Sequence, residues 1–207
     1  MTALLSLVVA RSSASTTVLA DLSGDLPAAL GIPEPSGPGL GDWLGASPDV
    51  GVDALARLEV EVGRSLRLLP RGALPGVASS GSRAELLANW MAADGRVVVA
   101  DCGAADRTPA LELAAGATIS LVVVRPCYLA LRRVLAAPVR ATGVVLVDEP
   151  ERALRRRDVE DVLGLPVWAE VPRDPAVARA VDAGLLAGRV PRTAERSLER
   201  AVLAVAS

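Results

Sequence analysis

Short runs rich in valine and leucine recur along the chain, and segments with a helical pattern lie between them. Apolar runs of about four to eight residues, bounded by turn signals, are typical of strands that are buried on both faces. Their alternation with helices predicts βαβ units and therefore an α/β fold, a doubly wound, mostly parallel sheet in a three-layer α/β/α arrangement. The predicted strands are residues 16–21, 65–70, 96–101, 118–124, 143–148 and 167–172.

Helical patterns bordered by glycine or proline separate these strands, and they cover residues 82–93, 128–137, 150–164 and 174–188. The stretch 31–51 has too many prolines and glycines for a long element, so we expect a surface loop there with one short turn around Trp43. The sequence shows no linker, internal repeat or low-complexity tract. We therefore expect a single domain over residues 1–207.

The composition excludes several kinds of chemistry. The 207 residues include no lysine and no histidine, which rules out a Schiff-base lysine, a histidine general base, a histidine metal ligand and a Ser-His-Asp triad. Aromatic residues are 2% of the chain, too few for a surface that stacks nucleic-acid bases. The net charge of -2 gives no bulk attraction to phosphate backbones. We therefore expect no sequence-specific nucleic-acid partner.

The two cysteines and the two ends of the chain bear on its location. Cys102 and Cys127 are too few for a closed zinc site or a disulfide scaffold, so we expect apolar fillers in a reduced, cytoplasmic protein. No positive residue precedes the short apolar run at residues 4–9, which argues against an export signal. Residues 192–207 lack Phe and Trp anchors, so we expect a helix packed on the domain and weak or no membrane association.

Polar residues stand where several predicted strands end. Ligands of open parallel sheets bind beyond the carboxyl ends of the strands, so Asp21, Asp101 and Asp148 are site candidates. An aspartate in this position also caps the following turn, and this alternative stays open for each of them. Arg125 contacts a phosphate or a partner carboxylate in one interpretation, and in the other it pairs with Asp101 or Asp148.

Residues 152–164, RALRRRDVEDVLG, place a group of arginines directly before a group of acids. A basic patch of this kind is one interpretation. The acids lie within a turn or two of the arginines, which favours local pairing between residues four apart on a helix. We expect a solvated helix face.

The order of these segments resembles the MinD/ParA class of nucleotide-binding ATPases. Residues 17–33 (TVLADLSGDLPAALGIP) are similar to the family's second strand and the acidic segment after it, and residues 65–72 to the strand before its central helix. VVVADCG (97–103) is similar to the strand and switch segment that face the magnesium-nucleotide, and residues 163–184 to the last strand, the adenine-side loop and the helix after it. The resemblance covers about residues 2–190, and the order and spacing of the segments carry it.

This resemblance implies a P-loop NTPase-like fold, ATP and Mg²⁺ as cofactors, and either a homodimer or a different protein as partner. The implied site residues are Asp21 and Asp101 as catalytic residues, Asp101 also as the magnesium-side residue, and Thr2, Gly103, Pro172, Arg173 and Asp174 as nucleotide-binding residues.

The sequence departs from the family at the phosphate-binding loop. Such a loop holds phosphates with a nest of glycine N–H groups and a helix N-terminus, while a lysine neutralises charge and a Ser or Thr holds magnesium. This chain has no lysine and no glycine before Gly24. Without glycine the backbone cannot come close to a phosphate. We therefore expect weak nucleotide binding and no ATP hydrolysis by these 207 residues.

Two interpretations of the N-terminal residues stay open. In the first, residues 2–15 are the family's first helix, Thr2 matches the threonine after the missing lysine, and the first strand and loop would lie upstream of Met1. In the second, residues 4–9 are the first strand and residues 11–17 a degenerate loop. We favour the first.

The resemblance implies a function in cellular positioning, of chromosomes, the septum or surface machinery. The first hypothesis is a non-hydrolysing regulatory member, and the alternative is an active ATPase whose phosphate-loop segment is missing from this chain. An enzyme of the related synthetase branch would need a cluster of polar substrate-binding residues, which the sequence does not show. A receiver-like or flavodoxin-like module explains the strands but not the ending VPRDPAVARAVDAG (171–184).

Overall fold

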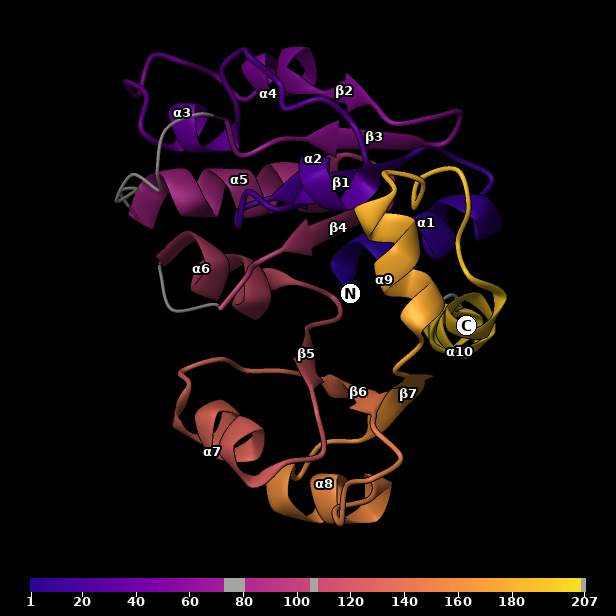
Figure 1. The fold of residues 1–207 in the computed structure, drawn as a ribbon. Helices are drawn as coiled ribbons and strands as arrows, with labels where there is room; N and C mark the ends of the chain where they lie inside the picture. Colours follow the sequence, from indigo (N-terminus) through magenta and orange to yellow (C-terminus); the bar gives the residue numbers. More distant parts are fainter. Residues whose placement is uncertain (73–80, 105–107, 206–207) are drawn as a thin grey trace.

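The computed structural model describes residues 1–72, 81–104 and 108–205, and within them the strands form two sheets (Figure 1). One sheet has four strands in the order β2-β3-β1-β4, and the other has three in the order β5-β6-β7. The strands are β1 (Thr17–Asp21), β2 (Val60–Glu61), β3 (Leu66–Leu69), β4 (Val98–Asp101), β5 (Leu121–Val124), β6 (Gly143–Asp148) and β7 (Val167–Pro172).

Every pairing is parallel except that of the two-residue β2 with β3. Each predicted strand is present, most of them shorter by one to three residues than predicted. The α/β class with a mostly parallel sheet between helices is thus confirmed. The sequence did not predict that the strands fall into two hydrogen-bonded sheets, which happens because β4 and β5 do not pair with each other.

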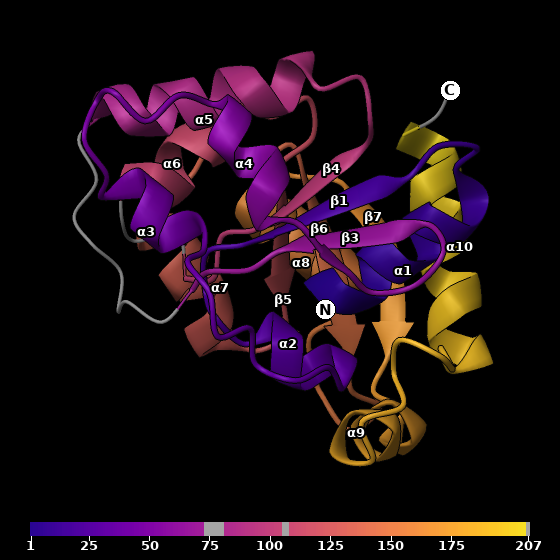
Figure 2. The same cartoon turned by 90° about the horizontal axis from the view of Figure 1, so that it is seen from above.

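Helices connect the strands and cover both faces of the sheets (Figure 2). The four predicted helices are present as α5, α7, α8 and α9, and the short turn predicted around Trp43 is α3. The helices are α1 (Thr2–Ser12), α2 (Leu26–Leu30), α3 (Leu40–Leu44), α4 (Asp53–Leu58), α5 (Gly81–Ala93), α6 (Thr108–Gly116), α7 (Tyr128–Ala136), α8 (Arg156–Leu163), α9 (Pro175–Asp182) and α10 (Arg192–Val205).

Two predicted helices are shorter than expected. Helix α8 begins only at Arg156, because Arg155 is extended, with φ -118° and ψ 174°. The N–H of Arg155 donates to the Asp158 carboxylate at 2.7 Å. Helix α9 ends at Asp182, before Gly184, whose φ of +65° lies in the left-handed region that ends helices. The predictions of a helix over 150–155 and over 183–188 are therefore wrong.

The N-terminal residues form a helix, α1, as the favoured interpretation predicts, and the alternative of a strand at residues 4–9 is wrong. Its buried residues include Ala3, Leu4, Leu7 and Val8. The buried hydroxyl of Ser6 donates to the carbonyl of Thr2 at 2.8 Å, which satisfies a polar group inside this apolar face.

The apolar core differs between the two faces of the sheets. On the face that α1 and α10 cover, one cluster contains residues of both sheets, among them Leu19, Leu68, Val145 and Val171. On the opposite face there are two clusters. One joins the four-stranded sheet to α5 and α6, and the other joins the three-stranded sheet to α7 and α8.

The C-terminal helix α10 packs on the protein, as predicted, with Ala194, Leu198 and Val202 buried. Glu195 near its start accepts from Arg11 of α1 at 2.5 Å. Residues 206–207 of the predicted helix lie outside the described residues. No helix in the described part of the chain is both long and apolar enough to cross a bilayer.

A buried arginine fixes the loop that contains α3. Arg83 of α5 is 4% exposed, and its guanidinium donates to the carbonyl of Trp43 at 2.6 Å and to that of Val50 at 2.9 Å. The same group lies 3.7 Å from the centre of the Trp43 ring, in cation–π geometry. One side chain therefore holds the proline- and glycine-rich loop against the helix.

Candidate functional site

Asp21 ends β1 and is fully buried. Its Oδ1 accepts the N–H groups of Ser23 at 3.0 Å and Gly24 at 2.6 Å, and its Oδ2 accepts that of Leu26 at 3.2 Å. Burial raises the pKa of Asp21, and the hydrogen bonds from Gly24, Leu26 and Ser23 act against this rise. Both carboxylate oxygens of Asp21 are thus bonded to N–H groups of the following turn, as in a cap.

Asp101 ends β4 in direct register with Asp21, as the strand-end pattern predicts. It is half-buried, and its Oδ1 accepts the N–H of Gly103 at 3.0 Å. Gly103 has a φ of +58°, and a Cβ atom there would lie 3.3 Å from the Cβ of Ser23. The turns after the two strands therefore lie against each other. No hydrogen-bond donor of residues 1–72, 81–104 or 108–205 is bonded to Oδ2 of Asp101.

Helix α1 begins at the same edge of the sheet. It contacts β4, the strand that ends at Asp101. Burial lowers the pKa of the Met1 amino group, and the negative charge of Asp101 acts in the opposite direction. Thr2, the first residue of α1, follows directly. The predicted residues Thr2, Asp21, Asp101 and Gly103 thus lie at one edge, beyond the carboxyl ends of β1 and β4.

Arg71 also lies at this edge, although the sequence did not predict it. It follows Pro70 at the end of the β3 segment, and its guanidinium donates to the carbonyl of Ser23 at 3.0 Å. A Cβ atom on Gly24 would lie 2.3 Å from the centre of that guanidinium, so the glycine makes room for the arginine. The strand-end rule that identified Asp21 and Asp101 would have found Arg71 if applied one residue beyond the proline.

The predicted adenine-side residues follow β7, the edge strand of the three-stranded sheet. The backbone N–H of Arg173 donates to the carbonyl of Asp148 at 2.9 Å, while the Arg173 side chain is exposed. Asp174 is the N-cap of α9, and its carboxylate accepts the N–H of Ala176 at 2.8 Å. Pro172 pairs in register with Asp148 of β6. These contacts are those of a turn that starts a helix.

The structure corrects the expected partner of Arg125. Its guanidinium lies 3.7 Å from the Glu149 carboxylate, not against Asp101 or Asp148, and Arg152 donates to the same carboxylate at 2.5 Å. The bond from Arg152, with the charges of Arg125 and Arg173, lowers the pKa of Glu149. Glu149 was not identified from the sequence because it lies one residue past the strand end. The structural pairing of Arg125 is confirmed, with a different acid.

The local pairing predicted for residues 152–164 is present. Arg156 contacts Glu160, four residues later, at 3.1 Å, and Glu170 of β7 at 3.4 Å. Its Nη2 also donates to the carbonyl of Val167 at 2.8 Å. These contacts tie α8 to the edge strand, so Arg156 does not belong to a free basic patch.

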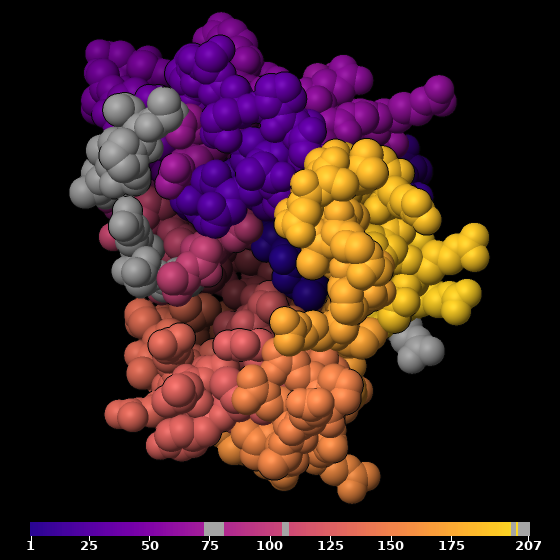
Figure 3. Space-filling model, in the orientation of Figure 1, coloured from indigo at the N-terminus to yellow at the C-terminus, as the bar shows by residue number. Residues whose placement is uncertain are grey.

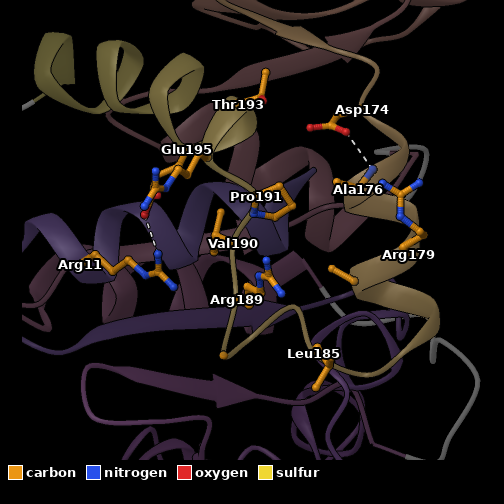
Figure 4. A pocket seen from close by; sticks show the side chains of 13 residues that line it. Arg11, Asp174, Ala176, Arg179, Leu185, Arg189, Val190, Pro191, Thr193 and Glu195 are labelled. Atoms are coloured by element: carbon orange, nitrogen blue, oxygen red, sulfur yellow. Dashed lines mark hydrogen bonds and ion pairs between the residues drawn. The ribbon is translucent and has the colours of Figure 1, made fainter.

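A cavity of about 740 Å³ opens beside α9 and the start of α10 (Figure 4). Of the predicted site residues, only Asp174 lines it, and the carboxylate of Asp174 is engaged in capping α9. Asp21, Asp101 and Gly103 are not among its lining residues. This cavity therefore does not join the two predicted halves of a nucleotide site. The charged lining residues are Arg11, Asp174, Arg179, Arg189, Arg192 and Glu195.

The residues at the carboxyl edge fit a magnesium ion only in part. Magnesium is usually held by one or two carboxylates together with water and substrate phosphates. Asp101 has one oxygen available for this, whereas both oxygens of Asp21 are bonded to its own turn. In the part of the chain that the structure describes, no group of three or more His, Cys, Asp or Glu side chains could hold a metal. The chain also has no lysine, the residue that neutralises the charge of a bound triphosphate in phosphate-binding loops.

Cys102 lies between Asp101 and Gly103 and packs against the apolar cluster under α5 and α6, as expected of a filler. Burial, with a smaller contribution from the charge of Asp101, raises the pKa of its thiol to about 11. Since only the thiolate reacts, we expect iodoacetamide to alkylate Cys102 at pH 8 about a hundredfold more slowly than free cysteine. Mass spectrometry of the Cys127→Ser variant measures this rate, and alkylation as fast as that of free cysteine would show the thiol to be open.

The arrangement of strands and helices matches known structures closely. No protein-family model matches the sequence, and no curated protein matches it either. A ParA family ATPase from Chlorobium tepidum TLS superposes with a TM-score of 0.80 at 18% identity, covering 98% of this chain and 91% of the other.

Two further matches are MinD structures. The septum site-determining protein MinD from Pyrococcus horikoshii OT3, complexed with Mg-ADP, has a TM-score of 0.76 at 16% identity and covers 99% of this chain and 88% of its own. The MinC:MinD cell division protein complex from Aquifex aeolicus has a TM-score of 0.74 at 17% identity. This match covers 99% of this chain and 88% of the other. Together with the parallel strands and the helices on both faces, these matches show that the chain has the fold of the MinD/ParA-like ATPases.

Proposed function

We propose that this chain is a positioning protein of the MinD/ParA kind, which helps to place a chromosome, the septum or surface machinery through contacts with other proteins. Two of the structural matches support it, a septum site-determining MinD and a MinC:MinD cell division complex. The partner is a second copy of this chain or a different protein. In this proposal the protein works in the cytoplasm, with weak or no attachment to membranes.

We propose further that the 207 residues bind ATP weakly and do not hydrolyse it. The observation that supports this is how the carboxylates at the strand ends are hydrogen-bonded. Asp21 is occupied by three N–H groups of its own turn, which leaves one oxygen of Asp101 for a magnesium ion. A triphosphate also needs clustered positive charge and amides that it can approach closely, and the chain has no lysine to supply the first.

The alternative function is an active ATPase that needs an additional segment to complete its phosphate site. One observation favours it. Helix α1 begins beside Asp101, so its N-terminal N–H groups and the positive end of its dipole lie at the edge where the aspartate has a free oxygen. These features would serve a nucleotide if a phosphate-binding loop stood before them.

Calorimetric titration with ATP and magnesium tests the proposal. For these 207 residues we expect a dissociation constant weaker than about 1 mM, which means only about 4 kcal/mol of binding free energy. Asp101→Asn should then change nothing. A matched control is Asp148→Asn, which alters the half-buried aspartate at the end of β6.

Binding in the micromolar range would overturn the proposal. If Asp101→Asn then abolished that binding while Asp148→Asn kept it, the active-ATPase alternative would take its place. Equal loss in both variants would place the nucleotide elsewhere and contradict both functions.

A further inference from the structure

The cavity beside α9 and α10 has a strongly basic lining. The whole chain has a net charge of -2, with 22 basic and 24 acidic residues. In the cavity the arginines outnumber the acids instead, since its charged residues are Arg11, Arg179, Arg189, Arg192, Asp174 and Glu195. The excess of positive charge is therefore a property of this place and does not follow from the composition.

Both acids of the lining are engaged in contacts within the protein. The carboxylate of Asp174 accepts the N–H of Ala176 as the N-cap of α9. The carboxylate of Glu195 pairs with Arg11 at 2.5 Å. Neither acid is thus paired with the other three arginines of the cavity.

Those three arginines have no counter-charge. Arg179, Arg189 and Arg192 are exposed, and none of them makes an ion pair or a side-chain hydrogen bond with another residue that the structure describes. Elsewhere in the chain arginines pair with acids, as Arg96 does with Glu59 at 2.7 Å. Like charges around one cavity repel each other, and an anion bound between them would offset this repulsion.

The arginines come from different segments and lie around the cavity. Figure 4 shows Arg11 of α1 on one side, Arg179 of α9 on the other, and Arg189 between them. Arg192 is the first residue of α10, so the positive end of this helix dipole lies beside the cavity. Guanidinium groups bind phosphate oxygens through pairs of parallel hydrogen bonds. Groups on separate sides suit a ligand with more than one phosphate.

The segment that carries Arg189 has a fixed backbone. The N–H groups of Gly188 and Arg189 both donate to the carbonyl of Leu185, at 3.1 and 2.9 Å. Leu186 and Val190 on either side are buried in the core. A ligand would therefore have little of this segment to order, which favours affinity. Figure 3 shows α9 and the residues after it, in amber and yellow, at the surface of the molecule, where a ligand can reach them.

The size and the rest of the lining suit a small organic molecule. Pockets for such ligands have volumes of about 300 to 1,000 Å³ and combine apolar walls with a few polar groups. This cavity has a volume of about 740 Å³, and its apolar lining includes Ala176, Ala180, Leu185, Val190 and Pro191. Apolar walls contact the carbon atoms of a ligand, so the cavity favours an organic phosphate over an inorganic ion.

The arginines of the cavity lie apart from the predicted phosphate and magnesium residues. Thr2, Asp101 and Gly103 are not among the lining residues. Arg11 lies near the other end of α1 from Thr2, about 14 Å away along the helix axis at 1.5 Å per residue. Asp174, which does line the cavity, uses its carboxylate to cap α9. A ligand held by these arginines would therefore not depend on Asp101.

From these observations we propose that the cavity is a binding site for a small organic molecule with two or more phosphate groups. Arg179, Arg189 and Arg192 hold the phosphates, and the apolar wall contacts the carbon skeleton of the ligand. The inference goes beyond the proposed function, because it assigns a further ligand to a different site. Its test contains neither nucleotide nor magnesium, so its failure is distinguishable from a failure of that function.

Calorimetric titration of the complete chain with fructose 1,6-bisphosphate tests the proposal. In a buffer of low ionic strength without magnesium we expect a dissociation constant below about 100 µM. The affinity should fall as salt is added, because exposed charges are screened. Fructose, which has the same carbon skeleton without the phosphates, should show no binding.

Four variants locate the binding. Arg179→Gln and Arg189→Gln each remove the charge of an exposed side chain, so both should keep the fold by circular dichroism and weaken binding at least about tenfold. Glu195→Gln removes a negative charge from the lining and should strengthen binding about threefold. Arg64→Gln is the matched control, because Arg64 is also exposed but does not line the cavity, and it should leave binding unchanged.

Several results would overturn the proposal. They are an absence of bisphosphate binding, equal losses in Arg64→Gln and Arg179→Gln, weaker binding in Glu195→Gln, and loss of binding in Asp101→Asn while the two arginine variants of the cavity still bind. Tighter binding of a short DNA duplex than of the bisphosphate would assign the arginines to a nucleic acid and would also contradict it.

Discussion

Replacing Asp21 by alanine is expected to lower the free energy of unfolding by about 3 kcal/mol, one of the two largest effects that we expect of a single substitution in this chain. The Asp21 carboxylate accepts the N–H groups of Ser23, Gly24 and Leu26, and alanine would leave all three without a partner. A buried N–H group left unpaired costs about 1 to 3 kcal/mol, and the two at Ser23 and Gly24 are only half-buried. Urea denaturation followed by circular dichroism measures the loss.

Asp148→Ala is the matched control, since Asp148 also ends a parallel strand but is only half-buried. No side-chain hydrogen bond of Asp148 to another described residue is present. We expect its replacement to cost less than about 1 kcal/mol. Equal losses for the two substitutions would show that Asp21 does not act as a cap.

The pH dependence gives an independent check on Asp21. Burial raises its pKa in the folded protein, so the folded state binds the proton more tightly than the unfolded state, whose value is about 3.9. The stability that this group contributes is therefore fully present below about pH 3.9 and is lost as the pH rises through the folded pKa. Relative to Asp21→Asn, the original protein should gain stability on acidification across this window. A relative loss on acidification would contradict the burial argument.

Replacing Arg83 by alanine is expected to cost about 3 kcal/mol as well. The substitution removes the guanidinium donor of the Val50 carbonyl and the cation–π contact with the Trp43 ring. It also removes one donor of the Trp43 carbonyl, which still accepts the N–H of Ala46. The loop that contains α3 has no other arginine contact of this kind in the described parts of the chain. Chemical denaturation measures the cost, and the tryptophan fluorescence should change in parallel.

Arg57→Ala is the control for this substitution. Arg57 pairs with Asp53 at 3.0 Å on α4, but its side chain is 74% exposed, and exposed pairs of this kind contribute about 0.3 to 0.5 kcal/mol. A cost at Arg83 as small as that at Arg57 would mean that the loop does not depend on the buried guanidinium.

The sequence predicted most of the strands because each is a continuous apolar run with a turn signal at its end. It could not predict that the sheet divides at β4 and β5, because both runs look like internal strands and pairing is not a property of one segment. The helices α2 and α4 have five and six residues, too short for a periodic pattern. Burial of Leu26, Leu30 and Leu55 stabilises them instead.

The candidate site was predicted in part. The strand-end rule correctly placed Asp21 beside Asp101, because carboxyl ends of neighbouring parallel strands meet at one edge. It could not decide that Asp21 caps its own turn, since this depends on the positive φ of Gly24 and on the direction of three N–H groups. Arg71 and Glu149 were missed because they lie two residues and one residue beyond a strand end, where a turn directs the side chain.

The central claim is that these 207 residues form two sheets in which β4 and β5 do not pair with each other, and, as we propose, that their phosphate site is incomplete. A crystal structure of the chain, grown with Mg-ATP, tests this most directly. The account predicts that β4 and β5 each keep one unpaired edge and that no ordered triphosphate lies beyond Asp101. A structure in which β4 pairs with β5, or in which ATP is bound at that edge with its phosphates held by backbone N–H groups, would contradict it.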